Sequence, residues 1–159
     1  MARTSAVDTN DGLARGDHLR SLSPVRVVAG DLRGRRIESP TGDATRPTTD
    51  KVREAVFNAL GSLDLIDGAR VLDLFAGTGA MGIEALSRGA EHCVFIENDR
   101  IALAVLRRNI EQLGLADRST IVSADVARES DARSGSRIAA HIEGAELVLA
   151  DPPYRYEKW

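Results

Sequence analysis

The sequence predicts an α/β fold, in which a mainly parallel sheet is covered by helices and preceded by an N-terminal β-hairpin. Three observations support this prediction. Strand-like and helical segments alternate from Arg70 onwards, which is typical of parallel strands joined by crossover helices. A glycine-rich turn at residues 77–82 follows the first of these strands. A β-branched run at residues 25–29, followed by Gly30 and Gly34, indicates the hairpin.

The expected elements follow from apolar patterning and from turn residues. A loop is expected at residues 40–47, and a helix begins at Thr48 or Thr49, where a hydroxyl can cap it. Its expected buried stripe is Val52, Val56, Phe57 and Leu60. The later strands are expected at 71–75, 93–96, 120–123 and 147–150. Later helices are expected at 79–88 and 99–113, closed by glycines at 89 and 114. Residues 127–144 are expected to form a loop or a short helix.

Composition limits the class of protein. With 159 residues, 43% of them hydrophobic and 4% aromatic, the chain is about the size of one domain with an aliphatic core. Apolar runs stay well short of the roughly 18 consecutive residues of a membrane span, and a secretory signal is missing from the N-terminus. The single Cys93 belongs to no disulfide or metal-ligand cluster. We therefore expect a cytoplasmic protein that binds no metal.

Basic residues are concentrated near the N-terminus. Residues 20–53 contain eight basic and four acidic residues, whereas the whole chain has a net charge of −3. This asymmetry predicts a polyanion contact on one face, although a genomic preference for arginine codons would produce the same count. We expect residues 1–22 to be a disordered extension, 23–60 a basic hairpin and helix, and 61–159 a cofactor-binding domain.

The glycine turn indicates a nucleoside cofactor. Its spacing, Gly77-x-Gly79-x-x-Gly82, is a weak signal alone, but its position between a strand and a helix strengthens it. Glu97 ends the next expected strand, where a carboxylate can accept hydrogen bonds from both ribose hydroxyls. NAD and S-adenosylmethionine fit these features equally well.

Two acidic residues favour S-adenosylmethionine. Asp73, beside the glycines, would repel the pyrophosphate of a dinucleotide and attract the ammonium group of a methionine. Asp125 follows the third expected strand, where its carboxylate could accept from an adenine amino group. Asp125 could equally be a helix or turn cap.

The segment Asp151-Pro152-Pro153-Tyr154 indicates the reaction. An exocyclic amine of a nucleobase is a poor nucleophile, because its lone pair is delocalised into the ring. A carboxylate and a nearby backbone carbonyl can each accept one N–H and so aim the lone pair at a methyl group. The prolines fix the turn, and Tyr154 offers a flat face to a flipped base. The alternative is a rigid turn at a strand end with a packed tyrosine.

With these motifs, the sequence resembles the class I methyltransferases that modify exocyclic amines, in particular the bacterial 16S rRNA guanine-N2-methyltransferases of the RsmD type. The resemblance covers residues 25–154. It is carried by residues 28–36 (VAGDLRGRR), 45–58 (TRPTTDKVREAVFN) and 72–89 (LDLFAGTGAMGIEALSRG), and by the Asp-Pro-Pro-Tyr turn. The first two blocks are more specific than the third, which many methyltransferases share.

The resemblance implies a set of site residues, a cofactor and a substrate. The cofactor, S-adenosyl-L-methionine, would be bound by Asp73, Phe75, Gly77, Gly79, Glu97, Asn98, Asp125 and Thr48. The target guanine would be held by Asp151, Pro152, Pro153 and Tyr154, and the RNA by Arg33, Arg35, Arg36, Arg46 and Arg53.

The resemblance also implies a partner and a larger sheet. The expected partner is 16S rRNA or the small ribosomal subunit, without metal or membrane, and we expect a monomer. The family pattern continues beyond Trp159 and completes a seven-stranded sheet, so we expect this sheet to be incomplete on its C-terminal side. The alternatives are a DNA adenine-N6 or cytosine-N4 methyltransferase and an inactive fragment that binds cofactor or RNA.

Overall fold

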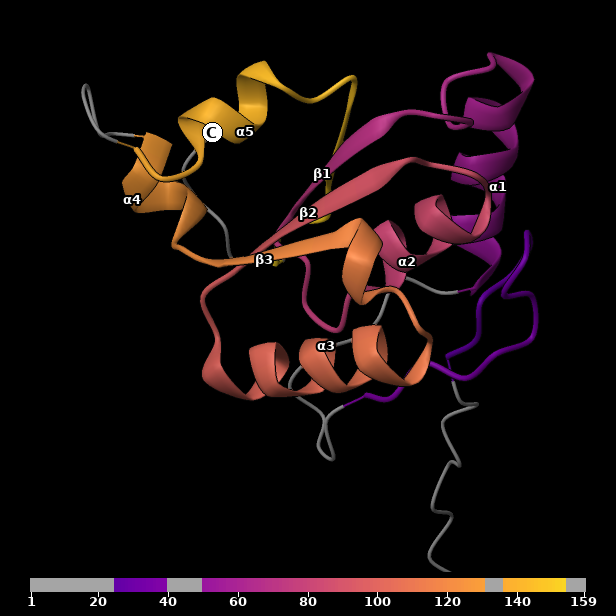
Figure 1. Ribbon diagram of the computed structural model, residues 1–159, viewed down its shortest axis with the longest axis horizontal. Coiled ribbons are helices and arrows are strands. Elements are labelled where there is room, and N and C mark those ends of the chain that lie inside the picture. The colour runs from indigo at the N-terminus through magenta and orange to yellow at the C-terminus, as the bar shows by residue number, and fades with distance from the viewer. Residues whose placement is uncertain (1–24, 40–49, 131–135, 154–159) are drawn as a thin grey trace, which may run out of the picture.

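A parallel four-stranded sheet forms the centre of the computed structural model, which describes residues 25–39, 50–130 and 136–153 (Figure 1). The strand order is β3-β2-β1-β4. The strands are β1 (Arg70–Leu74), β2 (His92–Glu97), β3 (Ser119–Ser123) and β4 (Leu147–Ala150). The predicted parallel sheet is therefore confirmed, and the strand bounds differ from the prediction by one residue at most.

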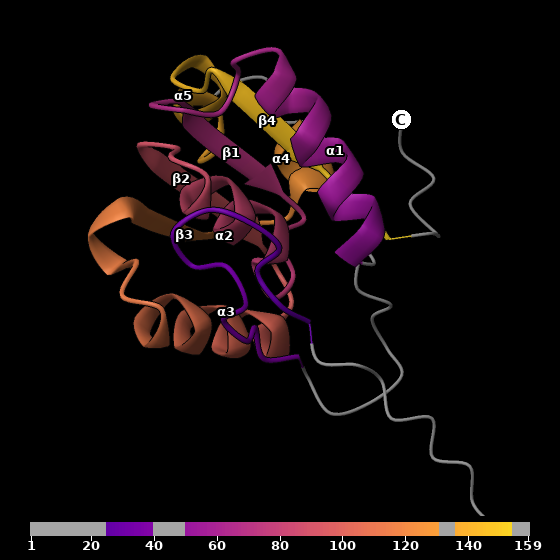
Figure 2. The same ribbon diagram turned by 90° about the vertical axis from the view of Figure 1, so that its right-hand side faces the viewer.

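Helices cover both faces of the sheet (Figure 2). One face carries α2 (Ala80–Ser87) and α3 (Arg100–Gln112), and their apolar side chains form the larger core cluster with the strands. The opposite face carries α4 (Val126–Ser130) and α5 (Ala139–Glu143), with a smaller cluster that includes Leu72 and Ile96. The region 127–144, expected to be a loop or a short helix, thus contains parts of two short helices.

Local sequence signals account for the start of α3 and for the ends of α2 and α3. Asp99 caps α3, because its side chain accepts a hydrogen bond of 2.8 Å from the backbone N–H of Ala102. Gly89 and Gly114 have positive φ angles of 106° and 69°, as predicted for helix-closing glycines. A short helical turn, η1 (Ala116–Arg118), then leads into β3.

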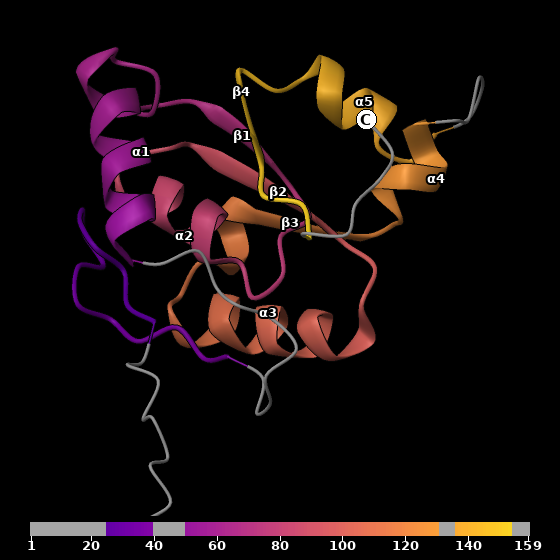
Figure 3. The same cartoon turned by 180° about the vertical axis from the view of Figure 1, so that it is seen from behind.

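The N-terminal hairpin packs on the C-terminal end of α2. Arg26 and Arg36 form its antiparallel bridge. The backbone N–H of Asp31 donates to the carbonyl of Ser87, the last residue of α2, at 2.8 Å. Gly30 makes this approach possible, since a Cβ there would lie 1.8 Å from the same carbonyl oxygen. Figures 1 and 3 show the hairpin and α1 together at one end of the sheet.

Helix α1 (Asp50–Ser62) buries only part of the predicted stripe, since Leu60 packs partly buried against the core. Phe57 is fully buried, but Val52 and Val56 are 52% and 38% exposed, so their predicted burial was wrong. Arg53, one turn before Phe57, occupies the buried face instead. The reason is tertiary, because the guanidinium of Arg53 meets buried acceptors on α2 and on the hairpin. The predicted helix start at Thr48 or Thr49 lies outside the described residues.

Candidate active site

The strand order brings the glycine turn and the Asp-Pro-Pro segment to the same edge of the sheet. β1 pairs with β2 on one side and with β4 on the other, and Leu74 is in register with Ala150. The residues that follow, Phe75 and Asp151, therefore leave the sheet side by side. In open α/β sheets this is the switch point at which ligands bind, beyond the carboxyl ends of the strands.

The glycine turn has an unusual backbone that leaves space above it. Phe75, Gly77 and Gly79 have φ angles of 62°, 56° and 88°, and the left-handed region is strained for a phenylalanine. A Cβ on Gly77 would meet no described atom within 4 Å, so this part of the turn faces open space. Gly82 has another purpose, since a Cβ there would lie 2.3 Å from the Phe95 ring; its absence lets α2 pack closely on β2.

Asp73 is a buried carboxyl group directly below this turn. It is 2% exposed, and its Oδ2 accepts a hydrogen bond of 2.9 Å from the backbone N–H of Gly82. The pKa of Asp73 is raised to about 7, chiefly by burial and to a smaller extent by the charges of Asp151 and Glu97, against the lowering effect of the Gly82 hydrogen bond. A cation above the turn would favour the ionised form of Asp73.

Glu97 connects the end of β2 to the glycine turn. Its Oε2 accepts from the backbone N–H of Gly77 at 2.7 Å. Its Oε1 accepts from the backbone N–H groups of Asn98 and Asp99, each at 2.8 Å. These three hydrogen bonds orient the carboxylate. Because the side chain is only partly buried, it also remains accessible from a neighbouring pocket.

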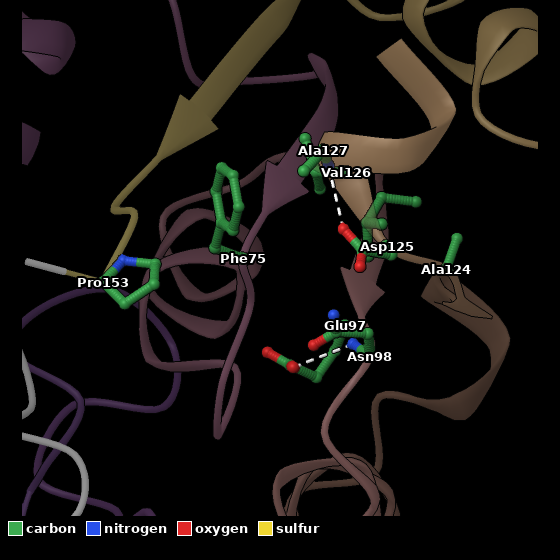
Figure 4. A pocket seen from close by; sticks show the side chains of 9 residues that line it. Phe75, Glu97, Asn98, Ala124, Asp125, Val126, Ala127 and Pro153 are labelled. Carbon is green, nitrogen blue, oxygen red and sulfur yellow. Dashed lines mark hydrogen bonds between the residues drawn. The ribbon is translucent and has the colours of Figure 1, made fainter. Parts of the chain in front are cut away.

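A cavity of about 260 Å³ lies beside the turn (Figure 4). Phe75 and Pro153 stand at one side of it, and Glu97 and Asp125 at another. Asp125 lines the cavity, where it can contact a ligand. It also caps the start of α4, because its Oδ1 accepts from the backbone N–H of Ala127 at 2.9 Å. The complete lining is Phe75, Ile96, Glu97, Asn98, Ala124, Asp125, Val126, Ala127 and Pro153.

The structure thus brings together most of the predicted cofactor and acceptor residues. Phe75, Glu97 and Asp125 line one cavity, and Pro153 reaches it from β4. Gly77 is bound to Glu97, and Asp73 is bound to Gly82 within the glycine turn. Asp151 is exposed at this edge. Thr48, Arg46 and Tyr154, which were predicted to take part, lie outside the described residues.

The hairpin arginines lie away from this cavity. Arg33, Arg35 and Arg36 are exposed, and Arg35 donates through Nη2 to the carbonyl of Gln112 at 3.1 Å. The hairpin turn contacts the last residue of α2, whereas the glycine turn precedes its first residue. A polyanion that contacted both sites would therefore extend along the length of α2.

Arg53 does not belong to the predicted RNA surface. Its side chain has no exposed area, and Nη2 donates to the carboxylate of Asp50 at 2.7 Å and to the backbone carbonyl of Arg26. The prediction that Arg53 contacts RNA is therefore wrong for this conformation. Two of its partners, the Glu84 carboxylate on α2 and the Arg26 carbonyl on the hairpin, come from segments distant in sequence. No local pattern therefore indicates that this guanidinium is buried.

Comparison with known proteins identifies the family. A model of the family described as Conserved hypothetical protein 95 matches residues 25–159. The chain belongs to this family. It is 38% identical over 131 residues to the ribosomal RNA small subunit methyltransferase D of Escherichia coli strain K12, a match that covers 82% of this chain and 61% of that protein. The chain therefore spans less than two thirds of the length of this relative.

Solved structures of similar proteins share the fold. A hypothetical protein of Thermus thermophilus is 30% identical, with a TM-score of 0.70 over 84% of this chain and 71% of that one. An RNA methyltransferase from Salinibacter ruber, solved in complex with S-adenosyl-L-homocysteine, is 25% identical, with a TM-score of 0.51 over 66% of this chain and 60% of that one. These findings confirm the class I methyltransferase fold and the resemblance to the RsmD type.

Sequence patterns did not single out two buried polar residues of this family member, Glu84 and Asn109. Both have 0% exposure, and their partners come from segments distant in sequence. Each occupies a helix position at which an apolar residue would ordinarily be expected. A polar residue at such a position is the sequence signal that could have identified them.

In the described part of the chain, no cluster of His, Cys, Asp or Glu is suited to a metal ion, and no helix is long and apolar enough to cross a membrane.

Proposed function

We propose that the chain transfers a methyl group from S-adenosylmethionine to the exocyclic N2 amine of a guanine in 16S rRNA. One observation carries the proposal: the glycine turn with its cavity and the Asp151-Pro152-Pro153 segment meet at one edge of the sheet. Two relatives support it, since one is named for methylation of small subunit rRNA and the other is an RNA methyltransferase with bound S-adenosyl-L-homocysteine.

The residues around the cavity suit S-adenosylmethionine. The open space above Gly77 allows close approach to the backbone, and Asp73 supplies negative charge below the turn. Glu97 is held in place to accept hydrogen bonds from ribose hydroxyls, and Asp125 lines the cavity where it can face an adenine amino group. When bound, S-adenosylmethionine supplies a methyl group activated by its positive sulfur.

Asp151 and the following prolines would position the acceptor amine. The Asp151 carboxylate accepts one N–H of the amine and a backbone carbonyl of the same segment accepts the other, which directs the nitrogen lone pair toward the cofactor cavity. Proline lacks a backbone N–H, so Pro152 and Pro153 add no donor that would compete for these acceptors. The amine becomes acidic only after it is methylated, so no general base is required beforehand. Positioning therefore accounts for most of the rate enhancement.

The substrate would be held by charge at a distance from the site of methylation. Arg33, Arg35 and Arg36 form an exposed basic group on the hairpin, suited to RNA phosphates. As part of the proposal, the substrate is the small ribosomal subunit or its assembly intermediate, and the protein acts as a monomer in the cytoplasm. A substrate of this size can contact the hairpin and the Asp151 edge at the same time.

A methyl-transfer assay tests the proposal against its alternatives. The full chain is incubated with tritiated S-adenosylmethionine and one of three acceptors: 30S particles from cells lacking the corresponding methyltransferase, their naked 16S rRNA, or duplex DNA. The expected result is label in N2-methylguanine of 16S rRNA and none in DNA. Label in adenine or cytosine of DNA would favour a DNA methyltransferase. Binding of S-adenosyl-L-homocysteine without transfer to any acceptor would favour a binding fragment.

A further inference from the structure

Asn109 of α3 joins the glycine turn to the segment that leaves the hairpin. Its side chain is fully buried, and its Nδ2 donates to the carbonyl of Thr78 at 3.0 Å. The same Nδ2 donates to the carbonyl of Glu38 at 3.1 Å, and Oδ1 accepts from the backbone N–H of Glu38 at 2.8 Å. Both N–H groups of the amide are therefore used, and the carbonyl oxygen is engaged.

Thr78 lies at the middle of the cofactor turn, between Gly77 and Gly79. Two glycines give this turn wide backbone freedom, so other contacts must select its conformation. One side is held where the backbone N–H of Gly77 donates to Glu97 at 2.7 Å. At Thr78, the side-chain donor among the described residues is Asn109, which binds the carbonyl directly.

The contacts of Glu38 show that Asn109 is not needed simply to secure the hairpin. The Glu38 carboxylate is also bound by Gln112 Nε2 at 3.0 Å and by Arg108 Nε at 3.3 Å, both on α3. The hairpin is further held at α2, where the backbone N–H of Leu32 donates to Ser87 Oγ at 3.0 Å. Asn109 differs from Gln112 and Arg108 in that it also binds the carbonyl of Thr78 in the cofactor turn.

We propose that Asn109 is a positioning residue for the cofactor: through the Thr78 carbonyl it holds the backbone of residues 77–79 in the conformation that receives S-adenosylmethionine. This inference rests on the proposed function, because it assigns the ligand of the same turn. A buried amide that met all its hydrogen bonds only within the hairpin would leave the Thr78 carbonyl without this bond, even though the backbone N–H groups of Gly77 and Gly79 are held elsewhere in the turn. The observed amide instead fixes the turn before ligand binds, which lowers the ordering cost of binding.

Two substitutions of Asn109, compared with two control variants, test the turn contact. Asn109→Asp keeps the shape and the oxygen that accepts from Glu38, but it removes both N–H donors. Asn109→Ala removes the entire amide. Gln112→Ala is one control, because it removes a contact to Glu38 and none to the turn. Ser87→Ala is the other, because it removes buried hydrogen bonds of the hairpin at a site remote from the turn.

Calorimetry with S-adenosyl-L-homocysteine, together with thermal unfolding of each variant, gives the first measurement. Both Asn109 variants should bind roughly tenfold or more weakly, as expected when a partly buried carbonyl of the turn loses its hydrogen bond. Gln112→Ala and Ser87→Ala should bind within about twofold of the parent, even where Ser87→Ala lowers the unfolding temperature. In methyl transfer, the Asn109 variants should raise KM for S-adenosylmethionine while kcat at saturation stays close to the parent value.

Several outcomes would overturn the inference, and they differ from failure of the proposed function. Parent-like affinity in a folded Asn109 variant would reject the positioning role. Equal losses in Ser87→Ala and Asn109→Ala would show that affinity simply follows stability. Failure of both Asn109 variants to fold would assign the residue to domain folding instead. By contrast, a parent chain that binds no S-adenosyl-L-homocysteine would reject the proposed function itself.

Discussion

Glu84 and Arg53 form an ion pair in which neither side chain has any exposed area, with Oε2 of Glu84 3.5 Å from Nε of Arg53. The Glu84 carboxylate also accepts from the backbone N–H groups of Val28 and Ala29, at 2.8 and 3.0 Å. Its Oε1 accepts from Arg88 Nε at 2.8 Å. One buried carboxylate therefore connects the hairpin, α1 and the end of α2.

Breaking this pair should destabilise the protein strongly. Glu84→Ala leaves the Arg53 guanidinium buried without this partner, which we expect to lower the free energy of unfolding by about 3–5 kcal/mol. Arg53→Ala should cost less than Glu84→Ala, because Arg88 still pairs with Glu84. Chemical denaturation measures this loss. Arg108→Ala is the control, because its pair with Glu38 is half exposed on both sides and should contribute less than about 1 kcal/mol. Similar small losses in all three variants would contradict the structural role of the buried pair.

Binding of S-adenosylmethionine should release protons near neutral pH. The pKa of Asp73 is raised to about 7, so this carboxyl is close to half protonated at pH 7. A cation favours its ionised form, so affinity should increase as the pH rises from about 6 to 8. Calorimetry in buffers of different ionisation enthalpy counts the released protons. Asp73→Asn should bind more weakly and abolish the release, whereas an unchanged proton count in this variant would point to another group.

The same pKa shift predicts how Asp73 affects stability without ligand. Its native pKa of about 7 lies above the ordinary value of 3.8, so between these values the native state holds more protons than the unfolded state. The contribution of Asp73 to stability should therefore fall as the pH rises from about 4 to 7 and level off above that. Denaturation of the parent and of Asp73→Asn over this range should differ in slope. Parallel curves would contradict the shift.

Glu97 should be required for cofactor affinity. Glu97→Ala removes charge-assisted hydrogen bonds to ribose, with an expected loss of about 1.5–3 kcal/mol in binding of S-adenosylmethionine. Because Glu97 also holds Gly77, part of this loss should come from a looser turn. Calorimetry on the two proteins decides, with NADH as a ligand that should show no saturable binding. Unchanged affinity of Glu97→Ala for S-adenosylmethionine would show that Glu97 does not bind the cofactor.

Asp151 should act on turnover and leave cofactor binding close to normal. Asp151→Ala should lower the rate of methyl transfer to 30S particles by two or more orders of magnitude, equivalent to about 3 kcal/mol of lost positioning. Asp151→Asn should keep partial activity, because its amide oxygen still accepts one hydrogen bond. Single-turnover rates and S-adenosyl-L-homocysteine affinity are the two measurements. Methylation by Asp151→Ala at the parent rate would reject the mechanism.

The hairpin arginines should determine the salt dependence of RNA binding. Replacing Arg33, Arg35 and Arg36 together with Ala should weaken RNA binding and flatten its salt dependence by roughly three contacts. Cofactor affinity should not change, because the hairpin turn lies at the opposite end of α2 from the glycine turn. Arg128→Ala with Arg137→Ala is the matched control, since both side chains are exposed in the α4–α5 region. If the salt dependence of RNA affinity is unaltered in the triple variant, the hairpin arginines are ordinary surface charges that do not contact RNA.

The alternation of apolar segments and glycines was sufficient to predict the strands, the long helices and the parallel sheet. These features depend on residues close in sequence, as in the cap formed by Asp99 and the positive φ at Gly89 and Gly114. The motif at Asp151 and the glycine turn also indicated the two segments on which the proposed site depends. The strand order then explains why they meet, because β4 pairs directly with β1.

Only the tertiary structure decided which polar residues are withdrawn from solvent and what they hold. The pattern of α1 predicted buried valines, but Arg53 is buried instead, because its guanidinium lies 3.5 Å from Glu84 and donates to the hairpin backbone. Asn109 acquires its contacts from Thr78 and Glu38, which lie 31 and 71 positions away. A local sequence pattern records the hydrophobicity of a position, whereas the partner that makes burial of an amide or a charge favourable is supplied by folding alone.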